Sequence, residues 1–168
     1  MRAAFALIHP ALLTVLVAAF VWLGEMHLLF ASGAFVLVAA WYYSVGMALH
    51  DKASSDAASP LWRFRLNLAA SASALPFVWL WASALQRDTA LFEAVLPYFD
   101  VLVGFNFALL VYSIYATYRV WHFLSERLLQ AEGEPTPSKE AIAGLMLQFW
   151  FWFIGAWFLR PRLQRALS

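Results

Sequence analysis

Five stretches of this chain contain no Asp, Glu, Lys or Arg, and each is between 18 and 25 residues long. They comprise residues 3–24, 26–50, 66–86, 101–118 and 141–159. A helix needs about 20 mostly apolar residues to cross the hydrocarbon core of a bilayer, where one charge costs about 2.5–3.5 kcal/mol. The spacing of charge therefore predicts an all-α, integral membrane bundle of five transmembrane helices.

The composition agrees with a membrane protein and argues against other classes. Of the 168 residues, 64% are hydrophobic and 12% are charged, against about 45–50% and about 25% in soluble domains. A soluble domain of this size has too little interior to hide so much apolar surface. A net charge of +1 gives no reason to expect nucleic acid as a partner. The absence of Cys excludes disulfides, thiolate metal ligands and cysteine nucleophiles.

The helices are expected to form a single transmembrane domain with short loops. Their spans lie at about residues 3–24, 27–49, 62–86, 101–123 and 140–160. Residues 88–99 carry apolar side chains at helical spacing, and we expect them to lie along the membrane interface. Ser59–Pro60 and Ser138 are suitable first residues for the third and fifth helices, and residues 124–139 form the longest polar connection. A cleaved N-terminal signal peptide is a weaker interpretation, because the apolar stretch is too long and no small-x-small cleavage site follows it.

The distribution of basic residues favours a cytoplasmic N-terminus, although the arginines near the C-terminus favour the opposite orientation. With the N-terminus inside, seven Lys and Arg residues fall in the cytoplasm and four fall outside, which the positive-inside rule favours. Three of those four are Arg160, Arg162 and Arg165, and a clustered basic tail usually stays in the cytoplasm. Two alternatives therefore remain open: an outside N-terminus with an inside C-terminus, or a fifth helix that does not fully cross.

Polar side chains within the apolar stretches gather in one half of the membrane. Helical spacing puts several of them on shared faces, and neighbouring helices run in opposite directions. The candidate polar pocket consists of His9, Arg63, Asn67, Ser71, Ser113, Thr117 and Gln148. Such a pocket is typical of a small transporter or channel. In the alternative, these groups only hydrogen-bond neighbouring helices, at about 0.6–2 kcal/mol each, and Arg63 extends to the headgroups.

Small and aromatic residues predict packing and anchoring positions. Pairs of small residues four apart let helix backbones approach closely. The predicted packing residues are Ala69, Ala70, Ser73, Ala74, Gly144 and Gly155. Trp and Arg side chains anchor helix ends at the lipid headgroups. The predicted anchors are Trp157, Arg160, Arg162 and Arg165.

No pattern in the chain indicates catalysis. The His-Glu-x-x-His and Gly-x-Ser-x-Gly motifs are absent, and no charge-free stretch holds a carboxylate. We therefore predict no catalytic residue, no metal site and no cofactor. The histidines raise one weaker alternative, in which His9 and either His50 or His122 ligate a b-type haem. Against it, the helical rise places His9 about 10 Å deeper than either partner.

The C-terminal segment is the most distinctive part of the chain. Residues 148–164 read Gln-Phe-Trp-Phe-Trp-Phe-Ile-Gly-Ala-Trp-Phe-Leu-Arg-Pro-Arg-Leu-Gln. This segment resembles the end of a group of small, uncharacterised bacterial multi-pass membrane proteins, in which an aromatic run leads into Ile-Gly-x-Trp and then Pro-Arg. Arg160 stands where that group has Gln, and the usual Pro before Ile-Gly is absent. The resemblance implies a protein of the bacterial inner membrane and implies no activity.

The sequence supports one leading hypothesis about function and two alternatives. The leading hypothesis is a non-enzymatic accessory or oligomerising subunit, in contact with the lipid bilayer and with a partner membrane protein or a second copy. It rests on the missing catalytic pattern, the small-residue positions and the aromatic last helix. The first alternative is a small transporter or channel that uses the polar pocket. The second and weaker alternative is a haem-binding redox subunit.

Overall fold

The protein is all-α, as predicted. Its computed structural model describes residues 9–26, 28–52, 60–134 and 136–167. The elements are α2 (Pro10–Met26), α3 (Leu28–Lys52), α4 (Leu61–Arg87), α5 (Thr89–Val95), the 3-10 turn η1 (Leu96–Tyr98), α6 (Phe99–Ala131), α7 (Lys139–Trp150) and α8 (Trp152–Leu167). Several expected positions lie outside the described residues: residues 3–8 of the first span, His27, and Ser59 before the third helix.

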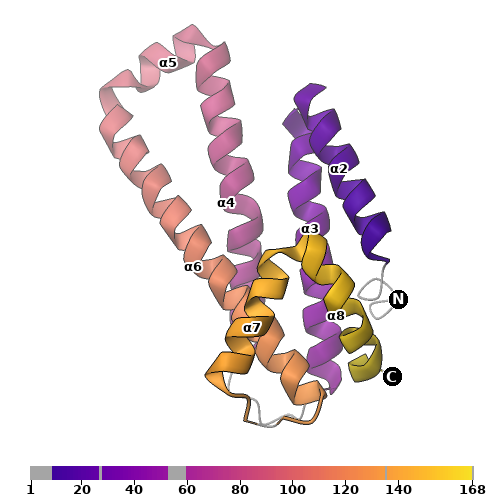
Figure 1. Cartoon of the computed structure of the whole chain (residues 1–168). Coiled ribbons are helices and arrows are strands. Elements are labelled where there is room, and N and C mark those ends of the chain that lie inside the picture. The colour runs from indigo at the N-terminus through magenta and orange to yellow at the C-terminus, as the bar shows by residue number, and fades with distance from the viewer. Residues whose placement is uncertain (1–8, 27, 53–59, 135, 168) are drawn as a thin grey trace.

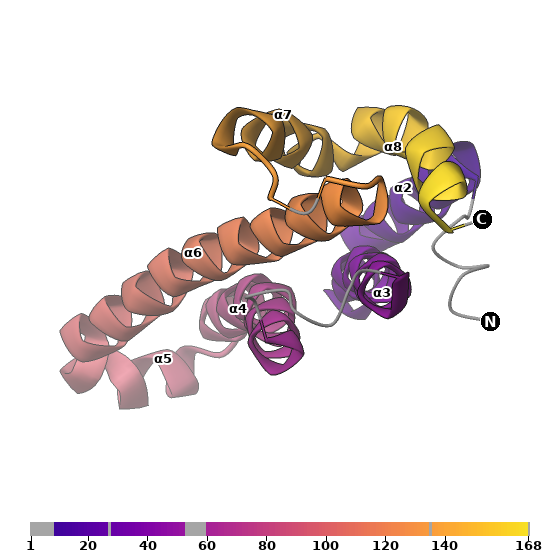
Figure 2. The same cartoon turned by 90° about the horizontal axis from the view of Figure 1, so that it is seen from below.

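Two long helical hairpins form the frame of the molecule. Helices α2 and α3 make one hairpin, and α4 and α6 make the other, joined through α5 and η1 (Figure 1). The hairpins diverge toward the α5 end. Helices α7 and α8 fold against the opposite end, where Figure 2 shows them alongside α6 and α2. The helices therefore pack together mainly at the end away from α5.

The buried core lies at this packed end. It joins the C-terminal halves of α3 and α6 to the start of α4 and to α7 and α8. Its largest members include Trp41, Phe64, Phe123, Phe149 and Leu163. The rings of Phe64 and Phe123 stack with centroids 4.5 Å apart. Gly46 permits this packing, because a Cβ there would lie 2.7 Å from Cε1 of Phe64.

Helix α6 continues well past residue 123, where the predicted fourth span ends. Residues from Leu124 onward were expected to be a polar connection, yet Leu124, Leu128 and Leu129 are fully or almost fully buried. The helix stops after Ala131 at Gly133, whose φ is +99°. The N–H groups of Gly133 and Glu134 donate to earlier carbonyls of the helix, which is the Schellman arrangement. The connection is therefore shorter than predicted, because apolar side chains draw this helical end into the core.

The helix predicted over residues 140–160 is divided into two. Helix α7 begins as expected at Ser138, whose side chain accepts a hydrogen bond from the N–H of Ala141. The helix ends at Phe151, where the backbone has φ −85° and ψ 51°. Its 12 residues extend about 18 Å, which is shorter than a hydrocarbon core of about 30 Å. Helix α8 then runs back toward the end at which α7 began (Figure 1).

Two described helical stretches are long and apolar enough to cross a membrane. They are residues Gly33–Lys52 and Thr89–Ala131, and α2 contributes a shorter apolar stretch, Pro10–Trp22. Gly33–Lys52 is partly buried in the protein, whereas the apolar window of Thr89–Ala131 has no buried residue. The length and composition of these two stretches thus agree with a membrane protein.

Candidate functional site

The turn between α7 and α8 depends on a glycine. The N–H groups of Ile154 and Gly155 both donate to the carbonyl oxygen of Phe151, at 2.9 and 2.6 Å. Gly155 then packs directly on the backbone of Gln148. A Cβ at residue 155 would collide with the Gln148 carbonyl group and lie 3.0 Å from its Cα. Because backbone atoms cannot rotate away, no larger residue fits there. The predicted packing role of Gly155 thus takes the form of a tight turn within one hairpin.

Tyr42 of α3 holds the end of α7 in place. Its hydroxyl donates to the carbonyl oxygen of Phe149 at 2.7 Å and accepts from Nε1 of Trp121 at 3.2 Å. The break at Phe151 removes the helical partner of this carbonyl, and Tyr42 replaces it. Tyr42 is buried, so these bonds are made away from solvent. Sequence reasoning missed Tyr42, because one Tyr in a charge-free stretch carries no signal about a partner 107 residues away.

A groove of about 880 Å³ runs between facing side chains of α6 and α7. Its lining is mostly apolar and includes Leu110, Ile114 and Trp121 on α6 and Met146 and Trp150 on α7. The two tryptophan rings lie with centroids 5.0 Å apart. The remaining lining residues are Ser113, Thr117, Tyr118, His122, Lys139, Ile142, Ala143 and Leu147. The volume is in the range of sites that hold a small molecule or cofactor.

A small basic cavity adjoins the groove. Arg63 and Asn67 of α4 line it together with Arg119 and His122 of α6, and His122 also lines the groove. The cavity has a volume of about 10 Å³, which is close to the space that one water needs. Arg63 also stands 5.4 Å from the centre of the Trp62 ring. Three basic side chains thus meet beside an apolar groove.

The residues of the predicted polar pocket lie in several places. Ser113 and Thr117 line the groove, and Arg63 and Asn67 line the basic cavity. The hydroxyls of Ser71 and Thr117 donate to carbonyls of their own helices, at 3.0 and 2.8 Å. Within the described residues, the buried Oε1 of Gln148 has no hydrogen-bond partner. His9 packs edge-on against Trp157, at 5.4 Å between ring centres. The predicted pocket residues are spread over several sites because their positions depend on the distances between helices. Helical spacing in the sequence does not give those distances.

The predicted packing residues of α4 mostly face outward. Ala69 and Ser73 are exposed and Ala70 is half-buried, while the side chain of Ala74 lies outside the described set. The hydroxyl of Ser73 donates to the Ala69 carbonyl at 2.8 Å. A Cβ at Gly144 would have no heavy atom of another described residue within 4 Å. Ala69, Ser73 and Gly144 therefore lie on the surface of the chain and not in a close contact between its own helices.

One predicted anchor at the C-terminus, Arg162, contacts the residue that follows α6. Arg162 forms a two-pronged ion pair with Glu132, in which Nε donates to Oε1 at 2.8 Å. This hydrogen bond and the nearby charge raise the pKa of Arg162 above its ordinary value. Nε of Arg165 donates to the Pro161 carbonyl, and Arg160 is half-buried. The ion pair fixes the last helix to the same end as the loop that precedes α7.

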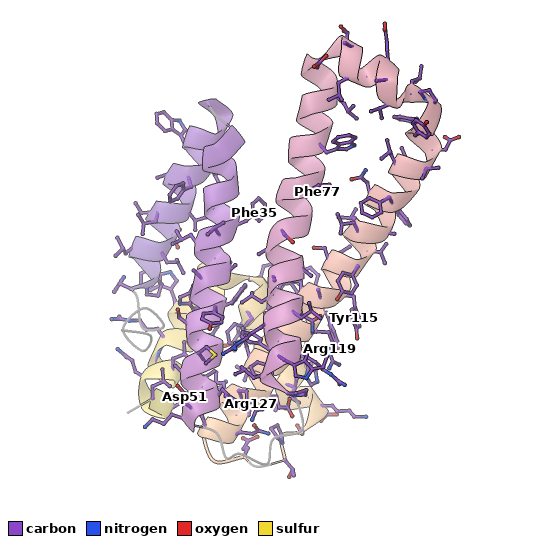
Figure 3. The ribbon with its side chains drawn as sticks, turned by 180° about the vertical axis from the view of Figure 1, so that it is seen from behind. Phe35, Asp51, Phe77, Tyr115, Arg119 and Arg127 are labelled. Atoms are coloured by element: carbon purple, nitrogen blue, oxygen red, sulfur yellow. The ribbon has the colours of Figure 1, made fainter. Side chains whose placement is uncertain are left out.

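Basic residues gather at the packed end of the molecule. Nine of the ten Lys and Arg residues in the described part lie there, namely Lys52, Arg63, Arg65, Arg119, Arg127, Lys139, Arg160, Arg162 and Arg165. The tenth, Arg87, ends α4 beside α5. Figure 3 shows Asp51, Arg119 and Arg127 toward this end and Phe35 nearer the other. The molecule therefore has one strongly basic end, whereas the α5 end carries mainly acidic residues, namely Asp88, Glu93 and Asp100.

No protein-family model, curated protein or solved structure matches the chain. Among the residues that the structure describes, no group of three or more His, Asp or Glu side chains is placed to hold a metal ion. Among the described residues, the α6–α7 groove offers the volume for a ligand, and the basic cavity places Arg63 and Arg119 beside it. A second apolar hollow of about 350 Å³ lies between α4 and the start of α6.

Proposed function

We propose that the protein is a multi-pass protein of the bacterial inner membrane and acts as a non-enzymatic subunit of a larger membrane assembly. The apolar half of α6 carries this proposal. Large hydrophobic side chains between residues 101 and 118 are exposed around most of the helix, outside the face of Ser113 and Ala116 that packs inward, as with Phe107 at 65% and Ile114 at 66%. A surface of this kind is unfavourable in water, and either lipid or the helix of another protein covers it in a bilayer.

In the proposed topology, α2, α3, α4 and α6 cross the membrane and α7–α8 enters it from one side as a hairpin. Both termini then lie in the cytoplasm. The one-sided distribution of Lys and Arg supports this arrangement through the positive-inside rule. It also removes the disagreement over Arg160, Arg162 and Arg165, because a returning α8 leaves them on the cytoplasmic side. The resemblance of residues 148–164 to bacterial membrane proteins supports the choice of membrane.

Two tyrosines on α6 favour a protein partner for part of the exposed surface. Tyr112 and Tyr115 are 43% and 54% exposed, and their rings lie 6.4 Å apart. Neither hydroxyl has a hydrogen-bond partner among the described residues. Arg119 marks the nearest charged level, and the helical rise puts Tyr112 about 10 Å further into the apolar layer. Hydroxyls at that depth need partners, so we propose that polar side chains of another membrane helix supply them.

Replacing both tyrosines with phenylalanine is expected to weaken the assembly without unfolding the protein. Tyr112→Phe/Tyr115→Phe keeps the aromatic area and removes two hydroxyls, each worth about 0.6–2 kcal/mol in a membrane. The association constant should fall by about tenfold or more, which lowers the fraction of the protein in complex. Light scattering after extraction in a mild detergent measures that fraction.

Tyr98→Phe is the matched control, because Tyr98 is an exposed tyrosine in η1 at the other end of the apolar stretch. It should assemble like the unmodified chain. A monomer with no co-purifying protein would contradict the subunit proposal. A complex that tolerates the double substitution would instead contradict the tyrosine surface.

A further inference from the structure

We propose that the α6–α7 groove binds an anionic phospholipid, with the acyl chain along the groove and the phosphate at the adjoining basic residues. This inference rests on the proposed membrane location. It adds a ligand class and a binding site to a protein proposed above only to contact other helices. The basic residues concerned are Arg63, Arg119, His122 and Lys139.

The groove suits an acyl chain because its walls are long and apolar. Leu110 and Ile114 line it on α6, and Met146 and Leu147 line it on α7. Leu147 is 57% exposed and Ile114 is 66% exposed, so the groove is open along the surface that faces the bilayer. Each methylene of a chain that leaves water for such a wall gains about 0.8 kcal/mol. A flexible methionine such as Met146 adapts to chains of different shape.

The charge at one end of the groove selects the headgroup. Lys139 begins α7 and His122 lies a few turns before the end of α6, so both stand toward the charged end of the molecule. His122 joins the groove to Arg63 and Arg119 in the small cavity. No Asp or Glu among the described residues lines either hollow. A phosphate at this end of the groove, beside the small cavity and not inside it, faces basic residues and no carboxylate, which is how basic pockets between membrane helices bind anionic lipids.

Other cations at the same end are committed elsewhere. Arg162 pairs with Glu132. Arg65 approaches Sδ of Met47 on α3 at 3.7 Å and lines neither hollow. The side chain of Arg127 is 1% exposed, with its guanidinium 5.1 Å from the centre of the Phe123 ring. None of these three residues lines the groove or the basic cavity.

The test measures lipid that remains on the protein after extraction from vesicles of equal phosphatidylglycerol and phosphatidylcholine. Native mass spectrometry is expected to find phosphatidylglycerol retained by the unmodified chain. Arg119→Gln/Lys139→Gln should retain about 25-fold less, at about fivefold for each cation removed. Lys52→Gln/Arg65→Gln removes the same charge at the same end, away from the groove, and should retain it fully. Inorganic phosphate at millimolar concentration should not displace the lipid, because it lacks the chain.

The groove itself is tested by adding bulk to its wall. Ala143→Phe should expel the lipid, since Ala143 lines the groove. Gly144→Phe, one residue along, points into open space and should not. The proposal is overturned if charge-removed and control variants retain equal lipid, if phosphatidylcholine is retained equally well, or if phosphate alone displaces the lipid. A chain recovered from the soluble fraction would refute the membrane location, whereas a membrane-extracted chain without phosphatidylglycerol refutes only the lipid site.

Discussion

Replacing Gly155 with valine is expected to destabilise the protein by at least about 3 kcal/mol, at the upper end of overpacking effects. The added side chain collides with the backbone carbonyl of Gln148, so relief requires opening the turn between α7 and α8. Opening that turn exposes Phe149, Leu159 and Leu163, which are buried in the core. Thermal unfolding in detergent, followed by tryptophan fluorescence, measures the loss.

Gly144→Val provides the comparison within the same hairpin. A Cβ at Gly144 would have no neighbour from another described residue within 4 Å, and valine is a slightly better helix former than glycine. The unfolding temperature of this variant should stay the same or rise slightly. Equal losses in the two variants would show that the tight turn at Gly155 is not what limits stability.

Tyr42→Phe is expected to cost about 1–3 kcal/mol, because it leaves the buried carbonyl of Phe149 without a donor. The same change removes the acceptor for Nε1 of Trp121. The ring itself is kept, so packing against Trp41 and Phe149 is preserved. The free energy of unfolding and the near-ultraviolet signal of Trp121 both report the change.

Tyr43→Phe is the matched variant on the next residue of α3. Tyr43 is half-buried, and its hydroxyl has no hydrogen-bond partner among the described residues. Removing that hydroxyl should change stability by less than about 0.5 kcal/mol. If Tyr42→Phe were equally harmless, the hydroxyl of Tyr42 would not be what fixes the end of α7.

The positions of the helices could be predicted from charge spacing, but some of the helix ends could not. Counting charge-free residues finds segments that lipid can surround. That rule ended the fourth span at about residue 123, although α6 continues to Ala131. The last turns of α6 interleave Glu126 and Arg127 with Leu124, Leu128 and Leu129, and Arg127 is itself buried. A sparse apolar stripe of this kind becomes visible only with helical periodicity.

The break in the last helix had no local signal at the point where it occurs. Residues 149–153 hold neither Gly nor Pro, which are the usual marks of a helix end. The turn depends on Gly155, four residues after Phe151, and on Tyr42 from a distant helix. Sequence reasoning noted Gly155 and left open whether this helix crosses fully. It had no means of finding the hydrogen bond that favours the break.

The candidate site could be predicted only as separate helix faces. Spacing correctly put Arg63 and Asn67 on one face of α4, and both line the basic cavity. Helical spacing does not say which face of α6 meets them, so Arg119 and His122 were not included with them. The groove arises from the position of α7 against α6, which follows from the unexpected break. The sequence shows which residues share one face of a helix. Which two helix faces pack against each other is known only from the structure.

Cysteine labelling in intact cells tests the central claim, a charged cytoplasmic end to which α8 returns. The chain contains no Cys, so Thr89→Cys in α5, Thr136→Cys before α7 and Gln164→Cys in α8 each give one exposed thiol. A membrane-impermeant maleimide should label Thr89→Cys, and it should label the other two only after the cells are opened. Labelling of Gln164→Cys from outside, with Thr136→Cys protected, would mean that residues 140–160 cross the membrane and would contradict the hairpin.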